Sequence, residues 1–181
     1  MGGLVWEEGS WKKVFECPIF SVRKALSRSP RGALRECTVI DAPNFVIVIP
    51  LLRSPRGDEF VMVRQWRHGS GSLSLEFPGG VMEPGENPED AARRELLEET
   101  GYAAGRLSKL GEFGSNPATM SNRAYFFLAE DIEDTGTRNL DADEFVDVEI
   151  VSAGEAIRGM GRPPYIHALM GSAVGLYLGN R

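Results

Sequence analysis

The chain has 181 residues, 42% of them hydrophobic, which is enough to bury a full core in one domain with an added terminal subdomain. Its formal net charge of -6 argues against broad binding of nucleic acid or an anionic membrane, because such partners require a basic surface. The two cysteines, Cys17 and Cys37, form no Cys-x-x-Cys pair and no apolar run reaches membrane-spanning length, so we expect a soluble, cytoplasmic protein without a disulfide framework or zinc site.

The N-terminal part of the chain is predicted to be β-structure. Two strand-like runs, Val14 to Leu26 and Leu34 to Ile40, are joined by Arg-Ser-Pro-Arg-Gly at 28–32. Proline sets the first corner of such a turn and glycine closes it, which is typical of a hairpin. We interpret residues 1–42 as an N-terminal β extension and residues 43–181 as the main domain.

The same five residues recur at 53–57, between the apolar runs Phe45 to Leu52 and Glu59 to Trp66. This position again predicts a hairpin turn. We interpret the recurrence as reuse of turn chemistry rather than as a domain repeat.

A helix is predicted over residues 88–100. Asn87 can cap its first turn, Pro88 suits the first helical position, and Gly101 supplies a left-handed stop. Acidic residues in the first turn complement the positive end of the helix dipole.

Three short strands are predicted after this helix, at Leu107 to Phe113, Ala124 to Ala129 and Phe145 to Val151. Strands on both sides of a central helix predict a mixed sheet flanked by helices, an α/β sandwich.

Two further helices follow these strands. The first begins at Ser152, with Glu155 in the capping-box position, and is broken by Gly159 to Pro164. The last is expected from about Tyr165 to Leu178.

The chemistry is concentrated on the helix at 88–100. At roughly 100° per residue, Glu95, Glu98 and Glu99 project from one face and share one patch. Two carboxylates about 5 Å apart repel by roughly 3 kcal/mol at an effective dielectric near 20 unless a cation lies between them. Oxygen ligands favour Mg²⁺ or Mn²⁺. Arg94 can pair with Glu98 or with Glu86 and orients the cluster.

A solvated acidic face is the alternative interpretation of these glutamates. The loop before the helix, residues 76–86, favours a site instead, because its glycines and prolines fix a tight path and let the backbone approach a ligand closely.

The spacing in this segment resembles the Nudix box. That motif spans twenty-three positions and consists of a glycine, a glutamate and an Arg-Glu-apolar-x-Glu-Glu-x-Gly run. In this chain it reads Gly80-x5-Glu86-x7-Arg94-Glu95-Leu96-x-Glu98-Glu99-x-Gly101-Tyr102. The resemblance implies a Nudix-type α/β/α sandwich and hydrolysis of a nucleoside diphosphate linked to another moiety.

The resemblance also implies roles for individual residues. Glu95 and Glu99 are the expected main metal ligands, with Glu98 serving a further ion and the Gly79 carbonyl completing a shell. The implied catalytic machinery comprises Glu86, Arg94, Glu98 and Glu144. Glu86 with Arg94 holds the loop on the helix.

The acidic run at 141–144 resembles a loop that supplies the general base in ADP-ribose hydrolysing relatives. Glu144 aligns best with that base and Asp143 is its competitor, whereas an ordinary acidic loop before a strand is the alternative.

Three other segments resemble ADP-ribose pyrophosphatases: Arg64-Gln65-Trp66-Arg67 before the box, Ser115-Asn116-Pro117 after it, and Glu8-Gly9-Ser10-Trp11 near the N-terminus. Arg67 and Arg64 are candidates to bind phosphate, although either is equally typical of a surface arginine on an edge strand. Trp11 is a candidate to stack on a purine, or a core residue. The resemblance implies that Pro117 binds substrate. Loop 116–122 differs in sequence from the corresponding loop of these relatives, so this loop does not predict the identity of the sugar.

Together these features predict a Mg²⁺-dependent (or Mn²⁺-dependent) pyrophosphohydrolase that cleaves ADP-ribose to AMP and ribose 5-phosphate. A GDP- or UDP-sugar, a dinucleoside polyphosphate, or a non-catalytic regulatory role are the alternatives. The expected partner is a small nucleotide sugar, with no nucleic acid and no membrane, and the resemblance implies a homodimer built on residues 11–42. His68 and His167 are expected to be structural or exposed.

Overall fold

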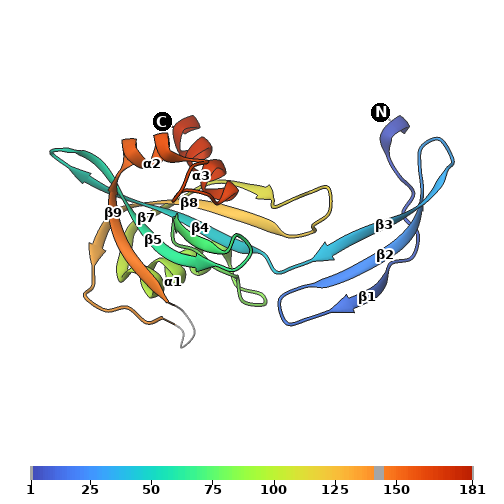
Figure 1. Ribbon diagram of the computed structural model, residues 1–181, viewed down its shortest axis with the longest axis horizontal. Helices are drawn as coiled ribbons and strands as arrows, with labels where there is room; N and C mark the ends of the chain where they lie inside the picture. The colour runs from blue at the N-terminus through green and yellow to red at the C-terminus, as the bar shows by residue number, and fades with distance from the viewer. Residues whose placement is uncertain (1, 141–144, 181) are drawn as a thin grey trace. The chain divides into compact units, whose positions relative to one another are not determined.

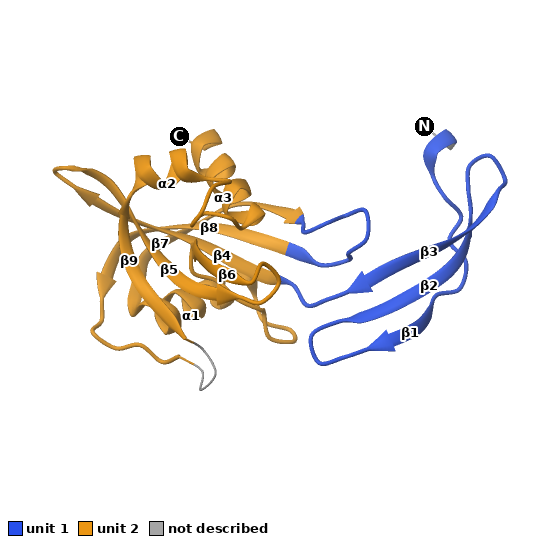
Figure 2. Ribbon diagram, viewed as in Figure 1, with its two compact units in different colours: residues 1–44, 114–123 blue, residues 45–113, 124–181 orange. Residues whose placement is uncertain are grey.

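The computed structural model describes residues 2–140 and 145–180 and is shown in Figure 1. The chain separates into two compact units, coloured in Figure 2. The first comprises Met1–Asn44 with Gly114–Arg123, and the second comprises Phe45–Phe113 with Ala124–Arg181.

The first unit contains a three-stranded antiparallel sheet. After a short 3-10 turn, η1 (Gly2–Leu4), the strands in spatial order are β1 (Lys12–Glu16), β2 (Ser21–Arg28) and β3 (Leu34–Asp41). The prediction of one run from Val14 to Leu26 was therefore wrong. Pro18 interrupts it, and the amide of Cys17 donates to the carbonyl of Phe20 at 3.0 Å, which closes a turn between β1 and β2.

The second unit is built on a mixed sheet, as predicted. Its strands are β4 (Phe45–Ser54), β5 (Gly57–Arg67), β6 (Ser72–Glu76), β7 (Tyr102–Gly114), β8 (Arg123–Asp134) and β9 (Val146–Ser152). Their order is β6-β5-β4-β8-β7, and β9 pairs with β5. The β4–β8 pair is parallel, whereas β5 runs antiparallel to β4, β6 and β9. Strand β6 was not predicted, and β7 begins before the predicted Leu107.

Strand β4 is buried on both faces, and its alternating side chains define two cores. One core joins Val46 and Val48 to the apolar face of α1 (Pro88–Thr100). The other joins Ile47, Ile49 and Leu51 to side chains of α2 (Ala153–Gly159) and α3 (Ala168–Gly179). The sheet thus lies between α1 on one side and α2 with α3 on the other, which confirms the predicted α/β/α sandwich (Figure 1).

The bounds of α1 agree with the prediction because both ends carry local signals. The Asn87 side chain accepts a hydrogen bond from the Glu89 amide at 2.8 Å, and Gly101 ends the helix at φ 79°.

Helix α2 begins after Ser152 and ends at Gly159, as predicted, but its cap and the start of α3 differ from the prediction. Ser152 makes no side-chain cap bond, so the capping box at α2 was wrong; Glu155 instead accepts a hydrogen bond from the Tyr165 hydroxyl at 3.4 Å. Helix α3 starts at Ala168 rather than Tyr165, because the His167 ring caps it. Within residues 2–140 and 145–180, no helix is long and apolar enough to cross a bilayer.

Candidate active site

Two consecutive glycines bring the loop after β6 against α1. The Gly79 amide donates to Glu99 Oε2 at 2.8 Å. Gly79 adopts φ 156°, and a Cβ there would lie 2.1 Å from the carbonyl oxygen of Val46. A Cβ on Gly80 would lie 2.5 Å from Glu95 Oε1. Only glycine therefore allows the backbone to lie this close to both carboxylates.

The same loop is fixed to the sheet from its other side. The amides of Val46 and Val48 donate to the carbonyls of Gly80 and Pro78, at 3.0 and 2.9 Å. The loop is therefore an extension of the β4 ladder, and the sheet sets its distance from the helix.

Arg94 is the centre of the electrostatic network. Its Nε and Nη2 donate to the two carboxylate oxygens of Glu86 at 2.9 and 3.0 Å, and Nη2 also donates to the Val81 carbonyl at 3.2 Å. Its Nη1 donates to Glu95 at 2.8 Å and to Glu98 at 3.0 Å. Both pairings considered from the sequence, with Glu86 and with Glu98, are formed.

These contacts shift the ionisation of the pair toward the charged forms. The hydrogen bonds to Glu86 raise the pKa of Arg94, with Glu95 and Glu98 adding to the effect, while burial opposes it. The hydrogen bonds from Arg94 lower the pKa of Glu86 against the opposing effect of burial. The loop and the helix are therefore held together by a charged pair at neutral pH.

The three carboxylates of α1 lie on one face of the helix, where Arg94 and the loop backbone hold them. Arg94 lies between Glu95 and Glu98, and Glu99 turns to the Gly79 amide. Across the described part of the chain, no group of three acidic, histidine or cysteine side chains has the arrangement of a metal site.

The donor chemistry nevertheless fits a divalent cation. Glu95 and Glu99 are buried residues, 7% and 4% exposed, and they offer carboxylate oxygens beside a loop in which a Cβ would leave no room. Mg²⁺ and Mn²⁺ prefer such oxygen ligands.

The two arginines of β5 that were predicted to bind phosphate each hold a carboxylate. Arg67 donates through Nε and Nη2 to Glu76 at 2.9 and 2.7 Å. Arg64 makes the same two-point contact with Glu149, with Nη2 at 3.0 Å from Oε2. Their binding of substrate stays a prediction.

Burial would raise the pKa of Glu76, which has 1% of its surface exposed, but the hydrogen bonds and charge of Arg67 outweigh burial and lower it. Glu76 was not singled out from the sequence. The available signal was the Gly69-Ser70-Gly71 turn, which folds β6 back on β5 and brings a carboxylate nine residues away to Arg67.

The remaining predicted residues lie elsewhere. Trp11 and Pro117 belong to the first unit, where the Trp11 indole donates to Glu8 at 3.1 Å and the Arg23 guanidinium lies 4.4 Å from its ring centroid. Glu144 and Asp143 fall outside the described residues.

Comparison with known proteins agrees with this geometry. The NUDIX domain model matches residues 43–169. A solved structure described as "Crystal structure of ADP compounds hydrolase" superposes with a TM-score of 0.83 at 22% identity, covering 96% of this chain and 92% of that chain, which supports the fold.

Two relatives have similar sequences. An ADP-ribose pyrophosphatase of Bacillus subtilis (strain 168) is 35% identical over 130 residues, which are 71% of this chain and 69% of the relative. A methanol dehydrogenase activator of Bacillus methanolicus is 28% identical over 159 residues, which are 86% of this chain and 84% of the relative.

The fold, together with the glutamates of α1 that contact the loop after β6, defines a hydrolase acting on pyrophosphate bonds. The chain belongs to the Nudix family. Nudix hydrolases generally use a divalent metal ion, in agreement with the carboxylate oxygens that α1 offers.

Proposed function

We propose that the chain hydrolyses ADP-ribose to AMP and ribose 5-phosphate with Mg²⁺ as the metal ion. The observation that carries the proposal is the pair of buried carboxylates, Glu95 and Glu99, against the Gly79-Gly80 backbone. The choice of substrate is supported by the similarity to an ADP-ribose pyrophosphatase.

The chain's own residues hold and orient the reacting groups. Glu95 and Glu99, with Glu98 and the Gly79 carbonyl, are the proposed metal ligands. When bound, divalent ions polarise the diphosphate oxygens and lower the pKa of the attacking water. That water adds to one phosphorus, and the bridging phosphorus–oxygen bond breaks, so no covalent protein intermediate is needed. Arg94 keeps Glu95 and Glu98 in place.

The remaining roles follow from the family resemblance. Glu144 accepts the proton of the attacking water, with Asp143 as its competitor. Arg67 and Arg64 contact the diphosphate while they remain oriented by Glu76 and Glu149. Trp11 and Pro117 are proposed as substrate-binding residues on the same resemblance.

The proposal is tested with purified protein, Mg²⁺ and a panel of ADP-ribose, GDP-mannose, a UDP-hexose and a diadenosine polyphosphate. Mass analysis of products formed in oxygen-18 water identifies both the substrate and the phosphorus attacked. We expect the highest kcat/KM for ADP-ribose, and a tenfold preference for GDP-mannose would overturn the choice.

A regulatory role is the second candidate, because a similar protein is named a methanol dehydrogenase activator. Against a role without turnover, all the carboxylates of the box are present, and Glu95 and Glu99 are buried at the loop. We expect Glu99→Gln to lower kcat for ADP-ribose at least about a hundredfold, as for the loss of a charged metal ligand. Unchanged turnover would favour the regulator. The homodimer and the cytoplasmic location stay predictions.

A further inference from the structure

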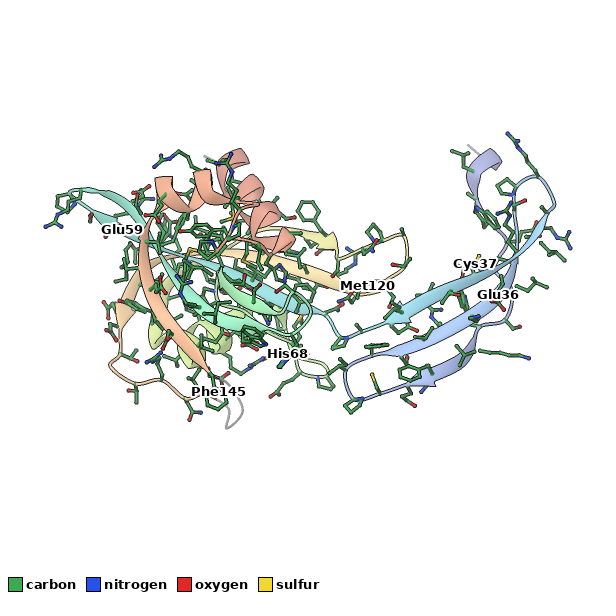
Figure 3. The ribbon with its side chains drawn as sticks, in the orientation of Figure 1. Glu36, Cys37, Glu59, His68, Met120 and Phe145 are labelled. Atoms are coloured by element: carbon green, nitrogen blue, oxygen red, sulfur yellow. The ribbon has the colours of Figure 1, made fainter. Side chains whose placement is uncertain are left out.

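A pocket of about 480 Å³ lies between the β5–β6 hairpin and the start of α3, within the second unit. His68, labelled in Figure 3, lies just past the end of β5 and lines it. The lining residues that matter here come from the hairpin, Arg67, Ser74 and Glu76, and from the residue before α3, His167. Its volume is in the range of small-molecule sites.

The charges of the pocket wall cancel. Arg67 and Glu76 face each other in a two-point pair, with nitrogen–oxygen distances of 2.9 and 2.7 Å. The pair carries no net charge, so the pocket does not attract a further anion beyond the diphosphate that Arg67 is proposed to contact. A carboxylate has about four lone-pair sites, so Glu76 keeps capacity to accept hydrogen bonds from hydroxyl groups.

His167 lines the same pocket. Its Nδ1 accepts a hydrogen bond from the Leu169 amide at 3.2 Å. Burial lowers the pKa of His167, although the charge of Glu76 opposes this shift, so the ring is neutral at pH 7. A neutral ring that accepts at Nδ1 carries its hydrogen on Nε2.

Ser74 adds a buried hydroxyl beside the Glu76 carboxylate. The residue is 0% exposed, and among the described residues its Oγ has no hydrogen-bond partner of ordinary geometry, although it lies near enough to Glu76 to help lower that pKa. Buried hydroxyls without partners are rare in native proteins, and a bound ligand or an ordered water is a usual explanation.

The pocket adjoins the candidate active site. Glu76 ends β6 and stands three residues before Gly79, whose amide binds Glu99. The pKa of Arg67 is raised first by its hydrogen bonds to Glu76 and also by the charge of Glu99, against the effect of burial. Glu76 therefore belongs both to the pocket wall and to the segment that leads to the loop against the box glutamates.

We propose that this pocket binds the hydroxyl groups of the sugar attached to the diphosphate, and that Ser74 and His167 are specificity-determining residues. The assignment rests on the proposed function, since it requires a sugar nucleotide as substrate. A neutral wall with hydroxyl, imidazole and carboxylate partners matches a polyol better than a second phosphate.

Two variants test this assignment with little damage to the fold. Ser74→Ala removes only the buried hydroxyl. His167→Asn keeps a side-chain oxygen that can cap α3 but removes the donor on Nε2. Ser108→Ala, at an exposed position of β7, is the matched control.

The measurement compares kcat/KM for ADP-ribose with that for the ethyl ester of ADP, which has the same diphosphate and no sugar beyond it. We expect each pocket variant to lose about tenfold on ADP-ribose and less than twofold on the ethyl ester, as for one lost hydrogen bond to a sugar hydroxyl. We expect the control to change neither value. Equal losses on both compounds, or no loss on ADP-ribose, would overturn the assignment.

Failure of the proposed function gives a different pattern. If wild-type protein does not hydrolyse ADP-ribose but hydrolyses another sugar nucleotide of the panel, the substrate proposal fails. The role of the pocket is then tested by comparing kcat/KM for that sugar nucleotide with kcat/KM for the ethyl ester of its nucleoside diphosphate. If no sugar nucleotide is hydrolysed, both proposals are overturned.

Discussion

Arg94 and Glu86 join the helix and the loop of the site by two parallel hydrogen bonds of 2.9 and 3.0 Å. The same guanidinium donates to Glu95 and Glu98. One side chain thus links the position of the loop to the orientation of two candidate metal ligands.

Replacement of Glu86 by glutamine is expected to impair both stability and catalysis. The pair is largely shielded, with 28% of the Arg94 and 13% of the Glu86 side chain exposed, so Glu86→Gln should lower the unfolding free energy by about 1–2 kcal/mol. It should also lower kcat at least about tenfold, because Arg94 loses its orientation. Glu89→Gln, in the exposed pair with Arg93, is the control and should change stability by less than about 0.5 kcal/mol. Equal changes of stability and kcat in the two variants would contradict the role given to the Arg94–Glu86 pair.

The same pair predicts a pH dependence. Arg94 lowers the pKa of Glu86 in the folded state below the ordinary value of 4.5, so the folded protein binds fewer protons at this group than the unfolded chain. Its contribution is fully present above pH 4.5 and is lost as the pH falls through the lower folded pKa. Urea unfolding across this range should show the stability difference between wild type and Glu86→Gln shrinking with acid. A difference that does not vary with pH would contradict the prediction.

The two loop glycines should respond differently to alanine. Gly80→Ala meets the flexible end of Glu95, so it should cost little stability but weaken metal binding about tenfold or more. Gly79→Ala meets the backbone of Val46 at a strained φ, so it should cost about 3 kcal/mol or more. Thermal melting and metal titration separate the two effects. Similar melting losses in both variants would show that the glycine contacts are wrongly assigned.

Helix α3 contains a glycine whose replacement by alanine is expected to stabilise the protein. Gly171 is exposed, and nothing lies within 4 Å of a Cβ built there. Gly171→Ala should raise the unfolding free energy by about 0.5–1 kcal/mol through helix propensity, without a change in kcat/KM. Chemical denaturation measures the gain, and a loss of stability would indicate that this face of α3 is covered.

The features that could be predicted from the sequence are those with local signals. Helix α1 was predicted at its observed bounds because Asn87 and Gly101 mark its ends, and its spacing placed Glu95, Glu98 and Glu99 on one face. The turn residues at 53–57 likewise predicted the hairpin between β4 and β5.

The features that were missed depend on pairing between distant residues. Strand β6 is a five-residue segment whose pairing with β5 follows from tertiary structure, and the Arg67–Glu76 pair depends on it. The start of α3 depends on the His167 ring, which is an unusual cap. The hydrogen bond from the Gly79 amide to Glu99 was missed, because helical spacing alone does not show where the loop backbone lies.

Calorimetric titration of Mg²⁺ into wild type and Glu99→Gln, with and without AMP, tests the central claim most directly. We expect wild type to bind Mg²⁺, or Mn²⁺ in its place, and Glu99→Gln to bind at least about tenfold more weakly, because one charged oxygen ligand is lost. Absence of binding of either ion to wild type, or equal binding by the two proteins, would contradict the assignment of the α1 carboxylates as a metal site.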